Sequence, residues 1–298
     1  MASAPPDSSR PVFRFAPSPN GRLHLGHALS ALTNEAMAHR FCGRLLLRIE
    51  DIDLTRCRPE FVEGIETDLE WLGIRFEPGF RRQSAHFDDY AGALASLRQR
   101  GLIYPCFCSR QEIRNAVVAR EAVTGRPWPV DSDGAPLYPD LCKVLGPGEA
   151  ERRIAAGEPH VLRLDMAAAI AAAGRSLGYT VFDADDARHV VQIAPERWGD
   201  VVLARKDVPT SYHLAVTVDD ALQGVTHVVR GRDLEAATDV HVLLQHLLGL
   251  PTPLYHFHRL LLDDDGQKLA KSRDSQSLAA LRDDGVTAVE IRRQLGFA

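Results

Sequence analysis

Residues Val12-Phe-Arg-Phe-Ala16 are followed by Pro17-Ser-Pro-Asn-Gly21 and then by Leu23-His-Leu-Gly-His27. The first run is apolar and β-prone and stops at a dense turn signal, so it predicts a strand. Apolar residues at near-helical spacing predict a helix over 28–41, and residues 45–49 predict a second, buried strand. Strand, helix and strand with short links form a βαβ unit. This unit predicts an α/β fold whose parallel sheet binds ligands at the carboxyl ends of its strands.

The rest of the chain divides into parts around this unit. Its 298 residues suggest two domains, or one domain with a large insertion. We expect a disordered tail over 1–11, two halves of the α/β core over 12–101 and 207–252, an inserted α+β subdomain over 102–206, and a C-terminal region over 253–298 with a charged loop and short helices.

Local patterns predict further elements within these parts. Helices are expected over 59–72, 166–173 and 236–248. Strand-like pieces are expected over 161–164, 179–182, 190–193, 201–203, 213–218 and 225–229, and after Pro253.

Composition limits the class of protein. Hydrophobic residues make up 45% and charged residues 25% of the chain, which excludes a wholly disordered protein. The N-terminus lacks a secretory signal and no apolar run reaches the length of a membrane span, so we expect a cytoplasmic protein with no membrane partner. The formal net charge of −5 by itself argues against a nucleic-acid partner, but total charge does not report how charge is distributed.

Two short motifs suggest a nucleotide site. His24 and His27 lie three residues apart at the start of the predicted helix, and Gly26 between them would let a phosphate approach the backbone. Far along the chain, Lys268 and Lys271 could clamp the β- and γ-phosphates of a nucleotide. Taken singly, a buried histidine at a helix start and an ordinary charged loop are the commoner explanations.

In this order and context, the two motifs resemble the His-Ile-Gly-His and Lys-Met-Ser-Lys-Ser signatures of class I aminoacyl-tRNA synthetases. Ala270 departs from the second signature and removes a hydroxyl. The resemblance implies a Rossmann-like catalytic core that uses ATP with Mg²⁺ to form an aminoacyl-adenylate. It also implies that His24, Gly26 and His27 approach the phosphates, with Lys271 more critical than Lys268.

Four further blocks resemble the glutamate-specific branch of that family. They are Arg14-Phe-Ala-Pro-Ser18-Pro-Asn-Gly21, Arg48-Ile-Glu50-Asp51-Ile-Asp53, Tyr212-His-Leu-Ala215 and Val229-Arg230-Gly-Arg-Asp233. The resemblance implies that Arg14 and Arg230 hold carboxylate oxygens, Glu50 the α-ammonium, and Ser18 and Tyr212 add hydroxyl bonds. Glutamate suits this set, because arginine grips a carboxylate through two bonds.

The distance from the lysine motif to the end of the sequence narrows the resemblance. Only 26 residues follow Ser272, whereas an ordinary glutamyl-tRNA synthetase continues with helical domains that read the anticodon, so we expect no anticodon-binding domain. The chain thus resembles the short glutamyl-Q tRNA(Asp) synthetases, as does its block from Val216 to Gln223. These enzymes activate L-glutamate without tRNA and attach it to the queuosine base of the tRNA(Asp) anticodon.

The resemblance implies that ATP, L-glutamate and queuosine-containing tRNA(Asp) are the substrates, and that the enzyme is a monomer. Two alternatives stay open. One is an enzyme that charges the tRNA 3′ end, and the other is a catalytically inactive paralogue that only binds tRNA.

Three of the five cysteines, Cys106, Cys108 and Cys142, cluster in the sequence. Without an export signal this favours reduced thiols and a metal over disulfides. The thiols alone leave a zinc site and three buried free thiols equally open. The resemblance to the short paralogues implies one structural Zn²⁺, held by the three thiolates and the phenolate of Tyr138. Cys42 and Cys57 fit no ligand spacing and are expected to be packing residues.

Overall fold

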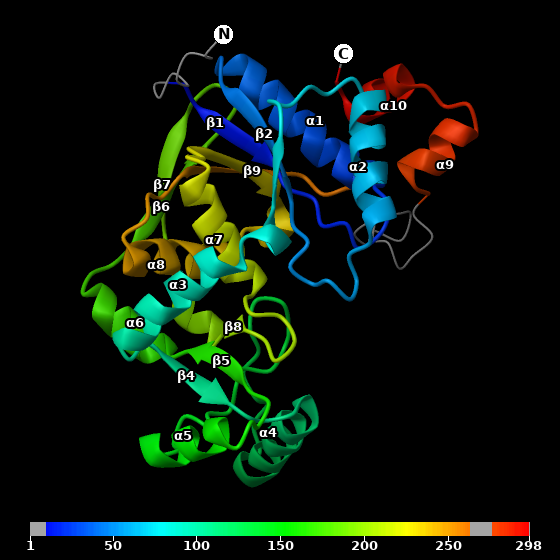
Figure 1. Cartoon of the computed structure of the whole chain (residues 1–298). Coiled ribbons are helices and arrows are strands. Elements are labelled where there is room, and N and C mark those ends of the chain that lie inside the picture. The colour runs from blue at the N-terminus through cyan, green and yellow to red at the C-terminus, as the bar shows by residue number, and fades with distance from the viewer. Residues whose placement is uncertain (1–9, 263–275, 298) are drawn as a thin grey trace.

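The computed structural model describes residues 10–262 and 276–297. Two parallel groups of strands form the upper layer (Figure 1). The first group has the order β1-β2-β3, and the second, β7-β6-β10-β9, is parallel except for β7. Their bounds are β1 (Val12–Phe15), β2 (Arg44–Ile49), β3 (Phe80–Arg82), β6 (Gly178–Phe182), β7 (Arg188–Gln192), β9 (His227–Gly231) and β10 (Leu254–His258).

Backbone and side-chain bonds at residue 226 join the two groups. The Thr226 N–H donates to the Val12 carbonyl at 3.0 Å, and the Val12 N–H donates to the Thr226 hydroxyl at 2.8 Å. The first strand of the chain therefore lies beside a strand made more than 200 residues later. The parallel sheet predicted from the βαβ unit is confirmed.

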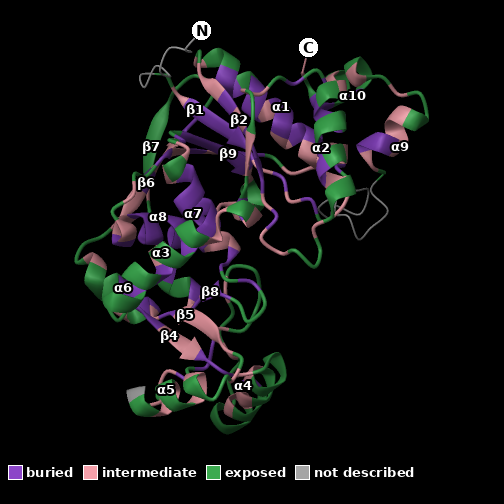
Figure 2. Ribbon diagram, in the orientation of Figure 1, coloured by how far each residue is buried: buried purple, intermediate pink, exposed green. Residues whose placement is uncertain are grey.

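Helices cover both faces of this layer (Figures 1 and 2). One face packs against α1 (Leu25–Arg40), α2 (Pro59–Trp71), α9 (Leu278–Asp283) and α10 (Ala288–Leu295). The helices on the other side are α3 (Phe87–Gln99), α6 (Met166–Ala173), α7 (Tyr212–Leu222) and α8 (Thr238–Leu248). No described helix is long and apolar enough to cross a membrane.

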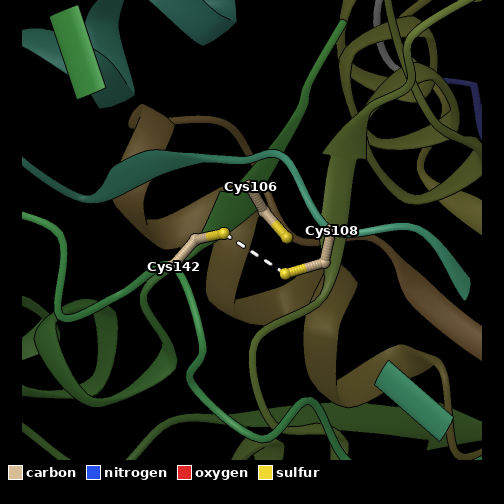
Figure 3. A group of neighbouring side chains, drawn as sticks. All are labelled: Cys106, Cys108 and Cys142. Atoms are coloured by element: carbon tan, nitrogen blue, oxygen red, sulfur yellow. Dashed lines mark hydrogen bonds between the residues drawn. The ribbon is translucent and has the colours of Figure 1, made fainter. Parts of the chain in front are cut away.

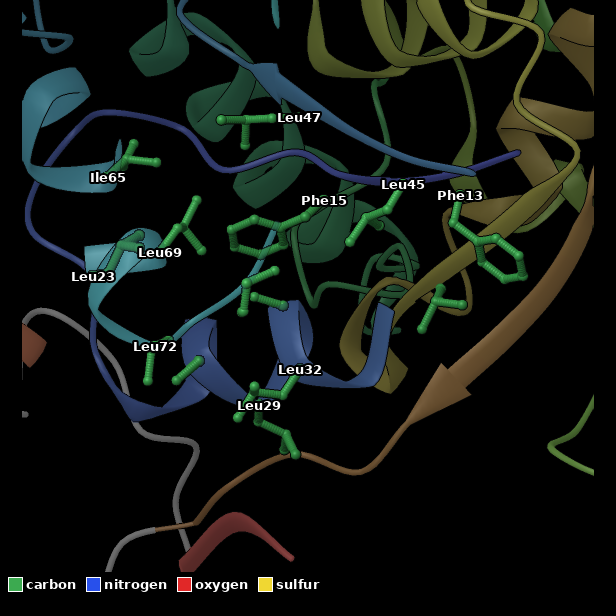
Figure 4. Packing of buried hydrophobic residues seen from close by; sticks show 14 of the residues in the cluster. Phe13, Phe15, Leu23, Leu29, Leu32, Leu45, Leu47, Ile65, Leu69 and Leu72 are labelled. Carbon is green, nitrogen blue, oxygen red and sulfur yellow. The ribbon is translucent and has the colours of Figure 1, made fainter. Parts of the chain in front are cut away.

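Strand alternation decides which side chains meet which helices, because successive residues of a strand point to opposite faces. Phe13, Phe15, Leu45 and Leu47 point into the core under α1 and α2 (Figure 4). The intervening positions of β1, β2 and β9 face the other way, and they include three buried arginines. The three are Arg14, Arg48 and Arg230.

A smaller antiparallel sheet, β4-β5-β8, forms the lower end of the molecule in Figure 1. Its strands are β4 (Ile103–Cys106), β5 (Val161–Leu164) and β8 (Val202–Ala204). The helices α4 (Arg110–Thr124) and α5 (Pro147–Ala155) lie beyond it. The described part of the chain also contains the short 3₁₀ turns η1 (Gln83–Ala85), η2 (Pro195–Trp198) and η3 (Arg232–Leu234).

Most predicted elements are confirmed, but the strand predicted over 213–218 is wrong. Those residues lie inside α7, which begins where the Ser211 side chain accepts the Leu214 N–H. The hairpin of β6 and β7 lies within the range 102–206 assigned to the insert, yet β6 pairs with β10. Part of the range assigned to the insert, the β6–β7 hairpin, therefore belongs to the sheet of the core.

Candidate active site

A cavity of about 550 Å³ opens where β1, β2, β9 and β10 end and α1 begins. This is the position expected for a ligand site in a parallel sheet. It is lined by eight of the residues singled out in the sequence: Arg14, Ser18, His24, Gly26, His27, Glu50, Tyr212 and Arg230. The other two nucleotide-site candidates, Lys268 and Lys271, lie outside the described residues.

His24 and His27 shape the rim of the cavity at the start of α1. The Gly26 N–H donates to His24 Nδ1 at 3.1 Å, and the His24 N–H donates to His27 Nδ1 at 3.2 Å. Because each Nδ1 accepts a bond, a neutral ring at either position carries its proton on Nε2. The first turn of α1 has no acidic residue, so its positive end also favours a phosphate.

Gly26 is required by the close approach of His24. A Cβ at residue 26 would lie 2.9 Å from Cε1 of the His24 ring, so any larger residue would push that imidazole from its capping position. The glycine of the motif is therefore explained by the contact between residue 26 and the His24 ring.

Arg14 is held by a buried network of charges on the α7 side of the sheet. Asp220 Oδ1 accepts from Arg14 Nε at 3.0 Å and from Arg48 Nη1 at 2.7 Å. Arg48, which is fully buried, also donates to Glu50 at 3.1 Å. The row Arg14, Asp220, Arg48 and Glu50 alternates in sign and carries no net formal charge.

The pKa values in this row reflect the balance between burial and charge. Burial alone would raise the pKa of Asp220, but the guanidinium groups of Arg14 and Arg48 outweigh it and hold the pKa below its ordinary value. For Glu50, burial outweighs the attraction of Arg48 and Arg14, and its pKa is raised. A cationic group arriving beside Glu50 would favour its charged form.

Arg230 lies in a different environment. It donates from Nη2 to the Thr238 hydroxyl at 2.7 Å and from Nη1 to His241 Nδ1 at 3.1 Å. Its guanidinium carbon lies 5.3 Å from the centre of the Tyr255 ring and 5.8 Å from that of Phe257. All of these neighbours are uncharged.

No carboxylate within residues 10–262 and 276–297 forms an ion pair with Arg230, and its Nε is buried without a hydrogen-bond acceptor there. An unpaired buried charge is costly unless an anion neutralises it. Tyr212, whose pKa is raised by burial, also faces this side of the cavity. The arrangement therefore favours a ligand with an anionic group next to Arg230.

The cysteines of the smaller sheet form a separate candidate metal centre. The Sγ atoms of Cys106, Cys108 and Cys142 lie within 4.8 Å of one another (Figure 3). Cys108 and Cys142 are 3.3 Å apart, and the Tyr138 hydroxyl lies 3.3 Å from Cys106 and 3.6 Å from Cys108. In a tetrahedral zinc site with Zn–S bonds of about 2.3 Å, neighbouring sulfurs are about 3.8 Å apart, so these positions fit.

The surroundings of Tyr138 also suit a ligand oxygen. The Cys142 N–H donates to the Tyr138 hydroxyl oxygen at 2.7 Å, which would help to stabilise a phenolate. Cys42 is exposed rather than packed, so its expected role as a packing residue is wrong, and Cys57 is half-buried with its thiol 4.0 Å from the Ser18 hydroxyl.

Sequence reasoning missed the residues that support the arginines. Asp220, Arg48 and His241 were given no role from the sequence, because buried charges are rare, although Arg48 stands in a block that resembles the glutamate-specific branch. Asp220 did lie in a block compared with the short paralogues, but its partner Arg14 is 206 positions away. The only local signal was the strand alternation that places Arg14 and Arg48 on one face.

Comparison with known proteins gives the family. Residues 12–296 match the family described as "tRNA synthetases class I (E and Q), catalytic domain". A Rhodobacter capsulatus protein named Glutamyl-Q tRNA(Asp) synthetase is 44% identical over 295 residues, covering 96% of this chain and 100% of that protein. The chain belongs to the glutamyl-Q tRNA(Asp) synthetase family. A second glutamyl-Q tRNA(Asp) synthetase, from Symbiobacterium thermophilum, is 38% identical over 95% of this chain and 85% of its own length.

A solved structure supports the class I synthetase catalytic fold for this chain. The glutamate tRNA ligase from Elizabethkingia meningosepticum, in complex with its amino acid, is 26% identical with a TM-score of 0.71. The match covers 89% of this chain and 52% of that ligase, so the chain spans about half the length of the solved relative. The Rossmann-like class I core expected from the sequence is confirmed.

Proposed function

We propose that this protein activates L-glutamate with ATP, without tRNA, and transfers the glutamyl group to the queuosine base of tRNA(Asp). The observation that carries the proposal is the single cavity in which the histidine motif and the glutamate-type residues meet. In the first step a glutamate α-carboxylate oxygen attacks the α-phosphorus of ATP and pyrophosphate leaves. In the second, a queuosine hydroxyl attacks the acyl carbon and AMP leaves.

Charge in the cavity suits glutamate. The Arg14 row has no net formal charge, whereas Arg230 adds one positive charge without a carboxylate partner among the described residues. Glutamate carries two carboxylates and one ammonium, and hence one net negative charge. We assign Arg14 and Arg230 to the carboxylates, Glu50 to the ammonium, and Ser18 and Tyr212 to hydroxyl bonds.

The start of α1 suits the phosphates. His24 and His27 lie at the start of α1 with each Nδ1 accepting a backbone N–H, and Gly26 keeps His24 in place. Lys268 and Lys271 are proposed to stabilise the charge that moves onto the leaving pyrophosphate. Mg²⁺ would be brought with ATP.

Glutamate-dependent ATP–pyrophosphate exchange tests the first step. Exchange without tRNA supports the proposal, and exchange that requires tRNA supports an enzyme that charges the 3′ end. No exchange under either condition supports an inactive paralogue. Equal exchange with glutamine would contradict the assignment of glutamate.

Labelled glutamate tests the second step. It should attach to tRNA(Asp) that contains queuosine and not to the unmodified transcript. Ribonuclease digestion should leave the label on the anticodon fragment and not on the 3′-terminal fragment. Labelling of the transcript at its 3′ end would contradict the proposed acceptor.

We further propose that Cys106, Cys108, Cys142 and Tyr138 hold one structural Zn²⁺. The metal would tie β4 to the loop before α5 as a closed site, without an open position for catalysis. Protein purified without added zinc should contain about one equivalent, and Cys142→Ser should lose it while Cys42→Ser keeps it. Less than about a tenth of an equivalent in the unaltered protein would contradict the site.

Three other expectations from the sequence remain proposals. They are a monomeric state, a cytoplasmic location and a division of the chain into parts at about residues 102, 207 and 253. Light scattering of the purified protein tests the first.

A further inference from the structure

Arg230 is fixed in the cavity by uncharged side chains of α8. Thr238 and His241 accept its Nη2 and Nη1 protons at 2.7 and 3.1 Å. His241 is almost fully buried, and on its far side its Nε2 lies 3.1 Å from Nδ1 of His213 in α7. A chain of three groups therefore runs from the cavity into the interior between α7 and α8.

Chemistry fixes the proton positions along this chain. An arginine can only donate hydrogen bonds, so His241 must accept at Nδ1. A neutral imidazole that accepts at Nδ1 carries its proton on Nε2, which then donates to His213 Nδ1. Protonation of His241 at Nδ1 would place its N–H against the N–H of the Arg230 guanidinium, so that two donors and two positive charges would face each other. Burial, together with the charge of Arg230, accordingly lowers the pKa of His241 well below its ordinary value.

We propose that His241 is a positioning residue that sets the preference for glutamate, by holding the Arg230 guanidinium in place without neutralising it. The inference rests on the proposed function, because it assumes that Arg230 receives a carboxylate of the amino acid. His213 supports His241 from behind and fixes the tautomer of its ring.

The contrast with Arg14 supports this role. Arg14 is oriented by the Asp220 carboxylate, which also cancels its charge. A carboxylate at residue 241 would orient Arg230 equally well but would remove the unpaired charge that favours an anionic side chain over a neutral amide. A neutral acceptor keeps the geometry and the charge together.

Four substitutions at one position separate geometry from charge. In His241→Asn the side-chain oxygen can take the place of Nδ1, so it should keep the bond to Arg230. His241→Gln places its amide nearer Nε2, and His241→Leu has no acceptor. His241→Asp accepts but brings a negative charge. His246→Leu, on the same helix and away from the cavity, is the matched control.

The measurement is exchange kinetics with glutamate and with glutamine, together with the KM for ATP. Loss of a hydrogen bond to a charged group predicts a rise of about 10- to 150-fold in the glutamate KM of His241→Leu. The KM for ATP should change less than about twofold, since the α1 end of the cavity is untouched. His241→Asn should restore most of the loss and His241→Gln less. His241→Asp should lower the ratio of glutamate to glutamine activity.

Two results would overturn the inference. One is a His241→Leu enzyme with unchanged glutamate KM. The other is a set of folded variants, judged by thermal unfolding, that lose activity with both substrates alike and are not rescued by asparagine. Either result requires an active unaltered enzyme. An unaltered protein without glutamate-dependent exchange contradicts the proposed function instead, so the two failures are distinguishable.

Discussion

Two of the arginines that line the cavity, Arg14 and Arg230, are both buried, but their surroundings differ. Arg14 lies in a row of opposite charges through Asp220, Arg48 and Glu50. Arg230 lies among a hydroxyl, an imidazole and two aromatic rings. The Asp220 carboxylate neutralises the charge of Arg14 before any ligand arrives. The uncharged neighbours of Arg230 leave its positive charge to be neutralised by the ligand.

This difference separates stability from binding. Removing one member of a paired buried set leaves the others uncompensated, so the folded state suffers. Removing an unpaired buried charge relieves the folded state, so only binding suffers. The two halves of one cavity should therefore respond to substitution in opposite ways.

The largest effect is expected for Asp220→Asn, which leaves Arg14 and Arg48 without their shared carboxylate. Breaking such a buried set costs about 3–5 kcal/mol of the free energy of unfolding. Urea unfolding measures it. Asp185→Asn, which breaks the exposed pair with Arg40, is the control and should cost less than about 1 kcal/mol. Similar small losses for both variants would show that the row does not stabilise the fold.

Arg230→Met should reverse this pattern. Glutamate-dependent exchange should fall about 10²- to 10³-fold, the usual loss when one charged donor is removed from an active site. The free energy of unfolding should stay the same or rise, because no described carboxylate loses its partner. A variant that unfolds as readily as Asp220→Asn would contradict the distinction between the two halves.

Thr238→Val tests the second side chain of α8 that holds Arg230. The substitution keeps the shape of the side chain and removes the hydroxyl that accepts from Nη2. A loss of about 1–1.5 kcal/mol corresponds to roughly a tenfold rise in the glutamate KM, with little change in the KM for ATP. Equal changes in both constants would instead indicate a general disturbance of α8.

A further prediction is a pH dependence of stability on the Arg230 side. Burial and the charge of Arg230 lower the pKa of His213 to about 4, against about 6.5 in an unfolded chain. Below about pH 6.5 the unfolded state binds more protons, so stability is lost as the pH falls toward 4. Unfolding in urea at several pH values measures the slope. His213→Gln should flatten it by about one proton, and His227→Gln, whose histidine also has a pKa of about 4, is the comparator.

The sequence predicted the cavity lining well because motifs keep those residues close to strand ends and helix starts. Arg14 and Glu50 were named through the resemblance to the glutamate-specific branch, and the structure places both at the cavity. The support behind them was not predictable, since Arg48 and Asp220 are 172 positions apart and only the folded chain brings them together.

The error over 213–218 has a related cause. A run with Val216, Thr217 and Val218 has β propensity, and residues 214–220 are all buried, so no polar face reveals the helical period. The usable signal was the capping residue Ser211, which lies just before the run. Packing of α7 against α3 and α8 outweighed local propensity.

The hydrogen bonds between Val12 and Thr226 also affect the order in which the protein can fold during synthesis. Ribosomes add about 5–20 residues per second, so β1 is synthesised roughly 10–40 s before the residues that lie along its free edge. In that interval the whole 102–206 region emerges and can form its own small sheet. The layer that carries the cavity closes last, and a truncated nascent chain holds the histidine motif without the arginine that completes the site.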